Sequence, residues 1–345
     1  MYTIKQIAEM AGVSPTTVSN VLNGNTAKVS AKTRQRVEAM LREHNYAPNM
    51  AAHILAHNRS RIVGVIMFME PRRNETVLED PFSSTLLGAI EVGLRNQGFY
   101  MMLHTTSDEE EVLHLSRAWK LAGLILIWVP EKIISTLKRS IATPVVYVDS
   151  YYSEEDENHH SVRLEDRSGG YEMAKYLLSM GHRRLVFLAN DSVVPGADHA
   201  RFAGCREALA EAGLELEDER FVPLSKDRAE RYVLYRRFAG DRDYCTALVF
   251  SADYYAAEAV AYLREIGVEV PRDLSVTGFD NNIFSRIVSP PLTTVHQDVD
   301  RKGRIAVELL MKALRGEPVE TPQVRLPIHL EIRESVARLD PSPVR

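Results

Sequence analysis

The sequence predicts an α/β protein with a small all-α unit at its amino end, and two observations carry this prediction. Between residues 3 and 41, apolar side chains recur at helical spacing in short segments that open with Thr or Ser. From residue 62 onward, short apolar runs alternate with longer amphipathic stretches, which is typical of βαβ units. We therefore expect a headpiece over residues 1–60 and a core over residues 61–345.

The headpiece opens with two short helices separated by a tight turn. Thr3 and Gln6 have the spacing of a capping box, and Gly12 supplies the backbone freedom that a sharp turn needs. Ser14 followed by Pro15 is an N-cap with a proline at the first helical position, so a second helix begins there. This arrangement is typical of a helix-turn-helix.

The second helix presents a small polar surface. Val18, Val21 and Leu22 point inward, and Gly24 is expected to end the helix. The outward side chains carry hydroxyl or amide groups, which can bond to base edges and phosphates. These residues are Thr16, Thr17, Ser19, Asn20 and Asn23. A solvated surface helix would also be polar, but the caps, the turn and the short helices together favour a DNA-reading helix.

A third helix and a break complete the headpiece. Ser30 is an N-cap, and Val37, Met40 and Leu41 share one face of the helix that follows it. Pro48 interrupts the chain, and one further short helix is expected over residues 48–57.

Positive charge is gathered in the headpiece. The 345 residues are 45 % hydrophobic and 26 % charged, as in an ordinary globular protein. The net charge is −5, but residues 1–60 hold seven Lys and Arg against three Glu, a charge of +4 that leaves −9 for the rest. Only the headpiece is therefore suited to a polyanion such as DNA.

Several classes of protein lack support in the sequence. No G-x-S-x-G, P-loop, G-x-G-x-x-G or H-E-x-x-H pattern occurs, so we expect neither an enzyme nor a bound cofactor. Cys205 and Cys245 have no metal spacing and indicate small buried thiols in a reducing cytoplasm. His159 and His160 follow an acidic stretch, where a solvated loop is favoured over a metal site. The longest apolar run, residues 62–69, is too short to span a bilayer.

The core reads as two successive sets of buried parallel strands with helices between them. Strands are expected at residues 62–67, 100–103, 124–128 and 145–148, and in the second set at 185–188, 247–250 and 274–277. Helices are expected from about Thr85, Glu109 and Glu131, and then over residues 171–180, 201–212 and 254–266. Two doubly wound halves follow from this pattern.

Polar and aromatic residues follow the predicted strands, where ligands bind in open parallel sheets. They are Trp128, Asp149, Asn190, Asp191, Asp253 and Asp280. Carboxylates and amides suit the hydroxyls of a sugar, and an indole suits its apolar ring face. An Asp at a strand end often only caps the next helix, and Trp128 alone is equally consistent with ordinary core. Their convergence on one crevice is the stronger argument.

Residues 3–60 resemble the DNA-binding headpiece of the LacI/GalR family of bacterial transcription regulators. The resemblance rests on the helix-turn-helix, on Val29-Ser-Ala-Lys-Thr-Arg34 and on Tyr46-Ala-Pro-Asn49. It implies DNA contacts by Thr3, Ser14, Pro15, Thr16, Thr17, Ser19, Asn20, Asn23, Asn49, His53 and Leu55. By this resemblance Leu55 is the apolar wedge that paired hinge helices push into the minor groove, where contacts with the bent duplex offset the cost of unstacking.

The core resembles the same family. Leu274-Ser-Val-Thr-Gly-Phe-Asp-Asn281, Pro290-Pro-Leu-Thr-Thr-Val295 and Gly181-His-Arg-Arg-Leu-Val-Phe187 carry the likeness. It implies the periplasmic-binding-protein fold, two α/β halves around a cleft, with effector contacts from the strand-end residues and from Phe82, Arg201 and Asp280. The residues expected to bind the effector are Phe82, Trp128, Asn190, Arg201, Asp253 and Asp280. Arg201 in a surface ion pair is the alternative, and such a pair would contribute little.

The chain departs from the family's pattern at four places. Ala252 stands where Asn is usual, and the connection at residues 70–80 is longer than usual, which reshapes the expected pocket mouth. Asn20 stands where Arg is usual, so we expect a different base in the operator half-site, because Arg prefers guanine and Asn prefers adenine. His53 stands where Arg is usual, so its phosphate contact is expected to strengthen on acidification.

The sequence therefore predicts a ligand-responsive regulator, most simply a repressor of carbohydrate-utilisation genes. We expect it to bind a palindromic operator as a homodimer, with double-stranded DNA and a small sugar-like effector as its partners. Two alternatives stay open: a core that answers mainly to a protein corepressor, and a sugar-processing enzyme with an appended DNA-binding head. Some members of the family respond to nucleobases or nucleosides, so the resemblance also implies this class of effector as a possibility for the core.

Overall fold

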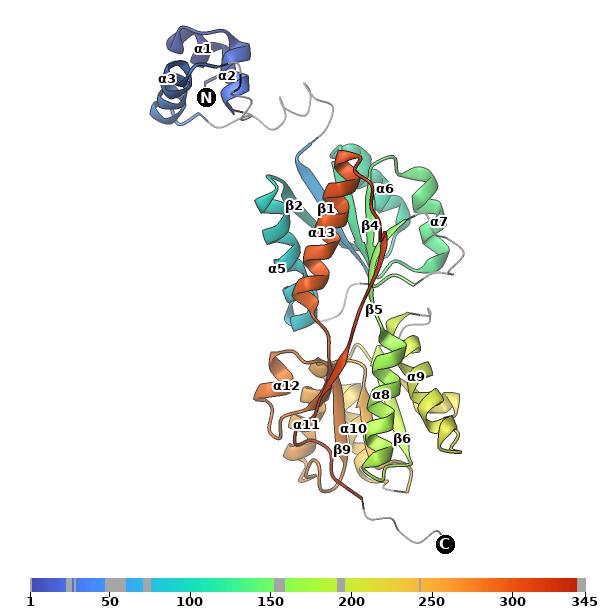
Figure 1. Ribbon diagram of the computed structural model, residues 1–345. Coiled ribbons are helices and arrows are strands. Elements are labelled where there is room, and N and C mark those ends of the chain that lie inside the picture. The colour runs from blue at the N-terminus through green and yellow to red at the C-terminus, as the bar shows by residue number, and fades with distance from the viewer. Residues whose placement is uncertain are drawn as a thin grey trace. The chain divides into compact units, whose positions relative to one another are not determined.

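The computed structural model divides the chain into two compact units, Met1–Ser60 and Arg61–Arg345 (Figure 1). It describes residues 2–22, 27, 29–46, 60–70, 76–151, 159–190, 196–241 and 243–339. Within these residues no helix combines the length and the apolar character that crossing a bilayer requires. The expected hinge segment at residues 48–57, the expected stop at Gly24 and residues 71–75 of the expected long connection lie outside the described residues.

The headpiece consists of α1 (Ile4–Ala11), α2 (Pro15–Leu22) and α3 (Ala31–Glu43) around one small core. The capping box is confirmed: the Thr3 N–H donates to Gln6 Oε1 (2.9 Å) and the Gln6 N–H to Thr3 Oγ1 (3.3 Å). Gly12 ends α1 in the left-handed conformation (φ 59°). Ser14 accepts from the Thr17 N–H (3.2 Å) and so begins α2. The fully buried residues of this core are Ile7, Ala8, Ala11, Val18 and Val37.

The first half of the core is a six-stranded parallel sheet in the order β11-β5-β4-β3-β1-β2. Its strands are β1 (Ile62–Phe68), β2 (Tyr100–Thr106), β3 (Gly123–Ile127), β4 (Val145–Val148), β5 (His160–Leu164) and β11 (Gln323–Leu326). α5 (Pro81–Asn96) and α13 (Val299–Arg315) pack together on one face. α6 (Glu109–Ala118) and α7 (Glu131–Ser140) cover the other (Figure 1).

The second half is a six-stranded sheet in the order β12-β10-β9-β8-β6-β7, antiparallel only between β10 and β12. Its strands are β6 (Leu185–Asn190), β7 (Phe221–Leu224), β8 (Ala247–Phe250), β9 (Ser275–Asp280), β10 (Thr293–His296) and β12 (His329–Glu331). α8 (Asp166–Ser179) and α9 (Ala197–Glu211) lie on one face, and α10 (Arg228–Ala239) and α11 (Asp253–Glu265) on the other, with the short α12 (Ile283–Ile287) after β9.

The chain passes between the two halves three times. It leaves the first sheet after β5, returns between β10 and α13 at residues 297–298, and crosses again between β11 and β12 at residues 327–328. In Figure 1 the last crossing is the long ribbon that runs from one sheet to the other. The fold class expected from the sequence is confirmed, with all seven predicted strands present.

Two expectations about individual segments were wrong. The run at residues 100–103 is not buried, because β2 is the edge strand of its sheet and leaves Tyr100 63 % exposed. His159 does not lie in a solvated loop, because it is 7 % exposed, packs edge-on against the ring of Tyr147 and has Lys138 Nζ 3.1 Å from its Nδ1.

α8 and α9 pack so closely that their backbones touch. A Cβ atom at Gly204 would lie 1.9 Å from the carbonyl oxygen of Arg167, and one at Gly170 would lie 1.8 Å from that of Arg201. Neither obstacle is a flexible side chain, so only glycine permits this approach. The contact fixes the position of the amino-terminal part of α9, where Arg201 is the fifth residue.

We predict that Gly204→Ala lowers the free energy of unfolding by about 3 kcal/mol or more, because the added methyl group forces the two backbones apart. Gly88→Ala is the matched control, since a Cβ atom there meets nothing within 4 Å and alanine favours the α5 helix. Urea unfolding of both variants measures the difference. Equal midpoints for the two variants would contradict the backbone contact.

Candidate functional site

The exposed face of α2 holds the described part of the expected DNA surface. Ser14, Pro15 and Thr16 are exposed, and Thr17, Ser19 and Asn20 are half-buried. Ser14 is also occupied within the chain, because its hydroxyl lies 2.9 Å from that of Thr17. Thr3 caps α1 and is exposed. Asn23, Asn49, His53 and Leu55 lie outside the described residues, so their DNA contacts stay predictions.

Strained backbone marks a second location, at the ends of three core strands. Trp128 (φ 61°) follows β3, Asp149 (φ 46°) follows β4, and Asp280 (φ 116°) with Asn281 (φ 56°) ends β9. Residues other than glycine rarely adopt a positive φ, and such strain gathers at functional sites. The three strand ends belong to both halves of the core.

Aromatic rings from the first half lie at this location. The Asp80 carboxylate accepts from the Phe82 N–H (3.1 Å) and so begins α5. The rings of Phe82 and Trp128 are stacked with their centroids 6.0 Å apart. Lys302, on α13, has its Nζ 5.1 Å from the centroid of the Phe82 ring, which is within the range of a cation–π contact.

A buried chain of hydrogen bonds joins the two halves. Lys302 Nζ, on α13, donates to both carboxylate oxygens of Asp149 (2.9 and 2.8 Å) and to Gln297 Oε1 (2.9 Å). Gln297 lies in the second crossing segment, and its Nε2 donates to Asp280 Oδ1 (2.5 Å). The chain therefore runs from the end of β4 to the end of β9. We call these four residues the junction chain.

Arg201 is part of the same region and is not in a surface ion pair, since it is 8 % exposed. Its Nε and Nη2 contact Asp166 Oδ1 (2.8 and 2.7 Å), and its Nη1 donates to the Ser251 carbonyl oxygen (2.6 Å). The guanidinium lies 3.6 Å from the centroid of the Phe279 ring. The Tyr151 hydroxyl also donates to Asp166. A buried Arg held on three sides is rigidly oriented.

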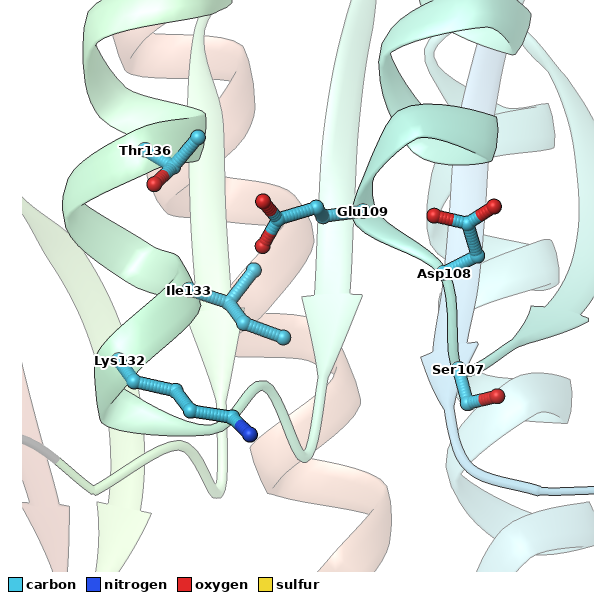
Figure 2. A pocket seen from close by; sticks show the side chains of 6 residues that line it. All are labelled: Ser107, Asp108, Glu109, Lys132, Ile133 and Thr136. Atoms are coloured by element: carbon cyan, nitrogen blue, oxygen red, sulfur yellow. The ribbon is translucent and has the colours of Figure 1, made fainter.

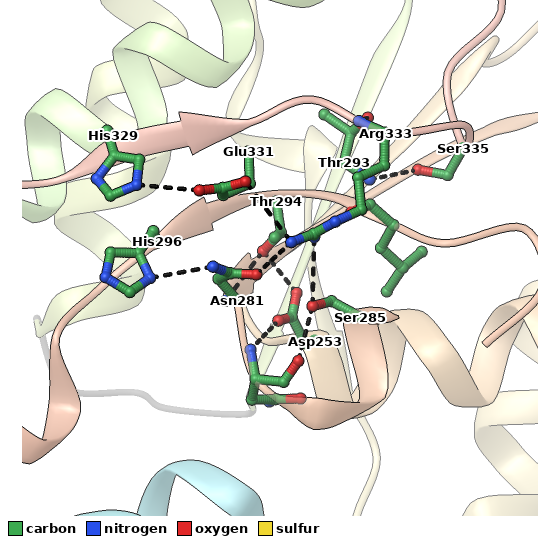
Figure 3. Close-up of polar contacts among 12 residues, drawn as sticks. Asp253, Asn281, Ser285, Thr293, Thr294, His296, His329, Glu331, Arg333 and Ser335 are labelled. Carbon is green, nitrogen blue, oxygen red and sulfur yellow. Dashed lines mark hydrogen bonds and ion pairs between the residues drawn. The ribbon is translucent and has the colours of Figure 1, made fainter. Parts of the chain in front are cut away.

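Asp253 is fully buried behind the β9 end (Figure 3). Its Oδ1 accepts from Thr294 Oγ1 (2.6 Å) and its Oδ2 from the Asn282 N–H (2.9 Å). A Cβ atom at Gly278 would lie 2.1 Å from Asp253 Oδ1, so the glycine makes room for this carboxylate. Asp253 thus holds the loop that carries Asp280. A direct contact between Asp253 and the effector stays a prediction.

Hydrogen bonds also connect the end of β9 to residues farther from the junction. Arg333 Nη2 donates to Asn281 Oδ1 (2.5 Å), and Asn281 Nδ2 lies 3.1 Å from His296 Nδ1 (Figure 3). These bonds tie β12 and the end of β10 to the strained residues. The Asn190 side chain lies outside the described part of the structure, so its effector contact also stays a prediction.

Burial dominates the electrostatics of the carboxyl groups. Desolvation raises the pKa of Asp280 well above its usual value, and the nearby charge of Asp253 raises it further. Desolvation likewise raises the pKa of Asp253 to about 7, against the lowering effect of its hydrogen bonds. The pKa of Asp149 is raised by burial, while Lys302 opposes the shift. Such shifts are typical of ligand sites.

Sequence reasoning missed Gln297, Lys302, Asp166 and Tyr151. One signal for Lys302 was present, because it follows Val299 by three residues and precedes Ala306 by four on the apolar face of α13. A lysine on the buried stripe of a helix needs a buried partner. The other three carry no local pattern, since their roles depend on partners that are distant in the sequence: Asp166 for Tyr151, Arg201 for Asp166, and Asp280 with Lys302 for Gln297.

A surface pocket of about 380 Å³ lies elsewhere, between the amino-terminal turns of α6 and α7 (Figure 2). Its lining residues are Ser107, Asp108, Glu109, Lys132, Ile133 and Thr136. All of them belong to the first half, and none is a residue expected to bind the effector. In the described residues no cluster of His, Cys, Asp and Glu is arranged to hold a metal ion.

The two cysteines are structural. Cys205 and Cys245 are buried and free of disulfide bonds, as expected. Burial raises the pKa of each thiol to about 12, so neither carries a reactive thiolate near neutral pH.

A helix-turn-helix unit joined to a core of two α/β halves is the architecture of a DNA-binding protein. Residues 3–49 match the model of the bacterial regulatory proteins of the lacI family, and residues 174–336 match a periplasmic binding protein-like domain. The HTH-type transcriptional repressor PurR of Pasteurella multocida (strain Pm70) is 31 % identical over 344 residues, which cover 97 % of this chain and 99 % of that protein.

Solved structures agree. The lac repressor dimer bound to operator and the anti-inducer ONPF matches with a TM-score of 0.81 and 26 % identity, over 97 % of this chain and 99 % of that one. The complex of the transcriptional regulator CelR with cellobiose matches with a TM-score of 0.70 and 26 % identity, over 97 % of this chain and 100 % of that one. The chain belongs to the LacI family of transcriptional regulators, which confirms the resemblance inferred from the sequence. Its relatives are named as regulators and not as enzymes.

The buried carboxyl groups predict a pH-dependent stability. Because the pKa of Asp253 is raised on folding, the folded state binds more protons than the unfolded state between about pH 4 and pH 7. This contribution to the free energy of unfolding is fully present below pH 4 and is lost as the pH rises to 7. Asp253→Asn, which can accept from the Asn282 N–H and donate to Thr294, lacks the titrating proton.

The variant should therefore gain stability relative to the parent protein by at least about 1 kcal/mol between pH 4 and pH 7. Urea unfolding at a series of pH values measures this change. Asp243→Asn, at an exposed position, is the control and should show a constant offset. A constant offset for Asp253→Asn as well would rule out the raised pKa.

Proposed function

We propose that this protein is a repressor of carbohydrate-utilisation genes that binds a palindromic operator in the cytoplasm as a homodimer and responds to a sugar-like effector. The observation that carries the proposal is the pairing of an open polar α2 face with a junction where buried polar groups of both halves converge. The α2 face is the site that contacts DNA. The junction is the site whose contacts differ between the closed and the open arrangement of the two halves. Two sites and two global states are what allosteric coupling requires.

The core offers apolar surface for a second copy. Val92, Tyr100 and Leu103 on α5 and β2 are exposed, as are Ile283 and Ile287 on α12. In Figure 1 these elements lie toward the same side of the core. A helix-turn-helix protein commonly binds a two-fold site as a dimer, since one unit makes too few contacts for tight, specific binding.

The polar groups of the junction support a sugar as the effector. Asp280 and Arg201 offer an acceptor and a donor, and the Phe82–Trp128 pair offers an aromatic face. The CelR–cellobiose complex shows a sugar on a related protein. Nucleobases and nucleosides are the second effector class to be tested.

The proposal is tested by operator binding with the full-length protein. Genomic fragments should be retarded at low salt, and a pentose, hexose, disaccharide or purine should change the retardation and raise the melting temperature. Failure to retard any fragment, with or without these ligands, would overturn the proposal. Operator binding that no ligand changes but a cytoplasmic protein enhances would favour a protein corepressor, and turnover of a bound sugar would favour an enzyme.

The α2 face makes a separate prediction. Asn20→Arg should change the preferred base at one position of each half-site toward guanine, because Arg bonds to guanine in bidentate fashion and Asn to adenine. Binding selection from a randomised operator measures the preference. Gln35→Arg adds the same charge on an exposed position of α3 and should raise affinity without changing sequence preference. An unchanged preferred site for Asn20→Arg would place Asn20 away from the bases.

The effector site proposed at the junction gives a further prediction. Asp280→Asn should weaken the effector by roughly 10- to 100-fold, because a buried carboxylate acceptor is replaced by an amide that donates from one of its atoms. The shift of melting temperature with ligand concentration gives the affinity. Asp300→Asn, at an exposed position in the first turn of α13, is the control. Equal affinities for the two variants would place the effector away from Asp280.

A further inference from the structure

The junction contains a buried ammonium group that has no spare donor. Lys302 is 1 % exposed, and an ammonium has three N–H donors. Two of them are bound by the Asp149 oxygens and the third by Gln297. The Phe82 ring lies beneath Nζ. The positive charge of Lys302 is therefore balanced by Asp149 in the wall of the proposed effector site.

The charge of Arg201 is matched as well. Asp166 pairs with one edge of the guanidinium, and Asp198 Oδ1 lies 3.8 Å from its Nη1. A negatively charged group near Lys302 or Arg201 would thus have to compete with the carboxylate that each of these two cations already binds.

The hydrogen-bond acceptors of the junction, in contrast to its cations, are only partly used. Among the residues that the structure describes, only Gln297 donates to the Asp280 carboxyl group, and it does so at Oδ1. Asp280 Oδ2 is left for a ligand. The carboxylate oxygens of Asp149 keep lone pairs beyond those that Lys302 uses. The junction can therefore receive additional hydrogen-bond donors without breaking any bond of the junction chain.

We propose that the Lys302–Asp149 ion pair restricts the effector to ligands without negative charge, recognised through hydroxyl or amino groups, and excludes their acid and phosphate forms. This inference rests on the proposed effector site and adds the charge class of its ligand. A hydroxyl or amino group of the ligand can donate to the unused acceptors of Asp280 and Asp149. An acid or phosphate faces the Asp149 carboxylate and must first separate a buried ion pair, which is strongly unfavourable.

The first test compares matched ligands on the full-length protein. Each pair shares one scaffold and differs in charge: glucose with glucuronate, galactose with galacturonate, ribose with ribose 5-phosphate, and inosine with inosine monophosphate. Glucosamine adds a cationic member. In every pair that binds, the neutral or amine form should bind at least about tenfold more tightly, measured by the melting-temperature shift and by the change in operator retardation.

The second test changes the pair itself. Asp149→Asn leaves the Lys302 ammonium without its counter-ion, so the acid or phosphate form of the scaffold that binds should gain affinity by about tenfold or more. Asp149→Asn combined with Lys302→Met removes both charges and should show no such gain. Circular dichroism checks that each variant is folded. If Asp149→Asn does not fold without ligand, the acid or phosphate form should restore folding, and the matched pairs still decide the question on the unmodified protein.

The outcomes separate this inference from the proposed function. Tighter binding of an acid or phosphate form by the unmodified protein would overturn the inference while leaving the regulator intact. A folded Asp149→Asn variant that gains no affinity for acids or phosphates would also overturn it. A core that answers to neither member of any pair contradicts the sugar or nucleobase effector and this inference with it.

Discussion

The core depends on a short chain of buried hydrogen bonds that begins at Asp149 and ends at Asp280. Taking an ammonium and a carboxylate out of water costs several kcal/mol for each ion, and the pair is stable only when its geometry is good and its remaining donors and acceptors are satisfied. Here Gln297 satisfies the third donor of Lys302 and passes the connection on to the second half. The position of each half therefore affects the electrostatic stability of the other.

Much of the fold was predictable because its local signals agree with its topology. The three headpiece helices carry their caps and their apolar faces in sequence, so their boundaries follow almost residue by residue. Six of the seven predicted strands lie in largely apolar runs, as expected where helices cover both faces of a sheet, and residues 274–277 include Ser275 and Thr277. β5, β7, β10, β11 and β12 were missed because they contain polar residues or lie at or beside a sheet edge. α13 was missed because no expected strand flanked it.

The site was predictable where residues follow strands and unpredictable where the chain crosses between halves. Trp128, Asp149 and Asp280 stand at strand ends, and topology alone brings strand ends together. Gln297 sits in a crossing segment whose side-chain directions depend on how the halves meet. The Gly181-His182 motif shows the same limit: it marked the family, but its physical role is a bond from His182 to Thr246 and to the carbonyl oxygen of Ala337.

The order of the strands has a consequence for synthesis on the ribosome. β5 is flanked by β11, and the sheet face beneath β3, β4 and β5 is covered by α13, yet both elements follow five of the six strands of the second half, β6 to β10, in the chain. The first half of the core therefore emerges early but lacks a strand and a covering helix until residue 326 has left the exit tunnel. Until then the part of its apolar sheet face that α13 covers is open to the solvent and to other nascent chains, which favours aggregation during this interval.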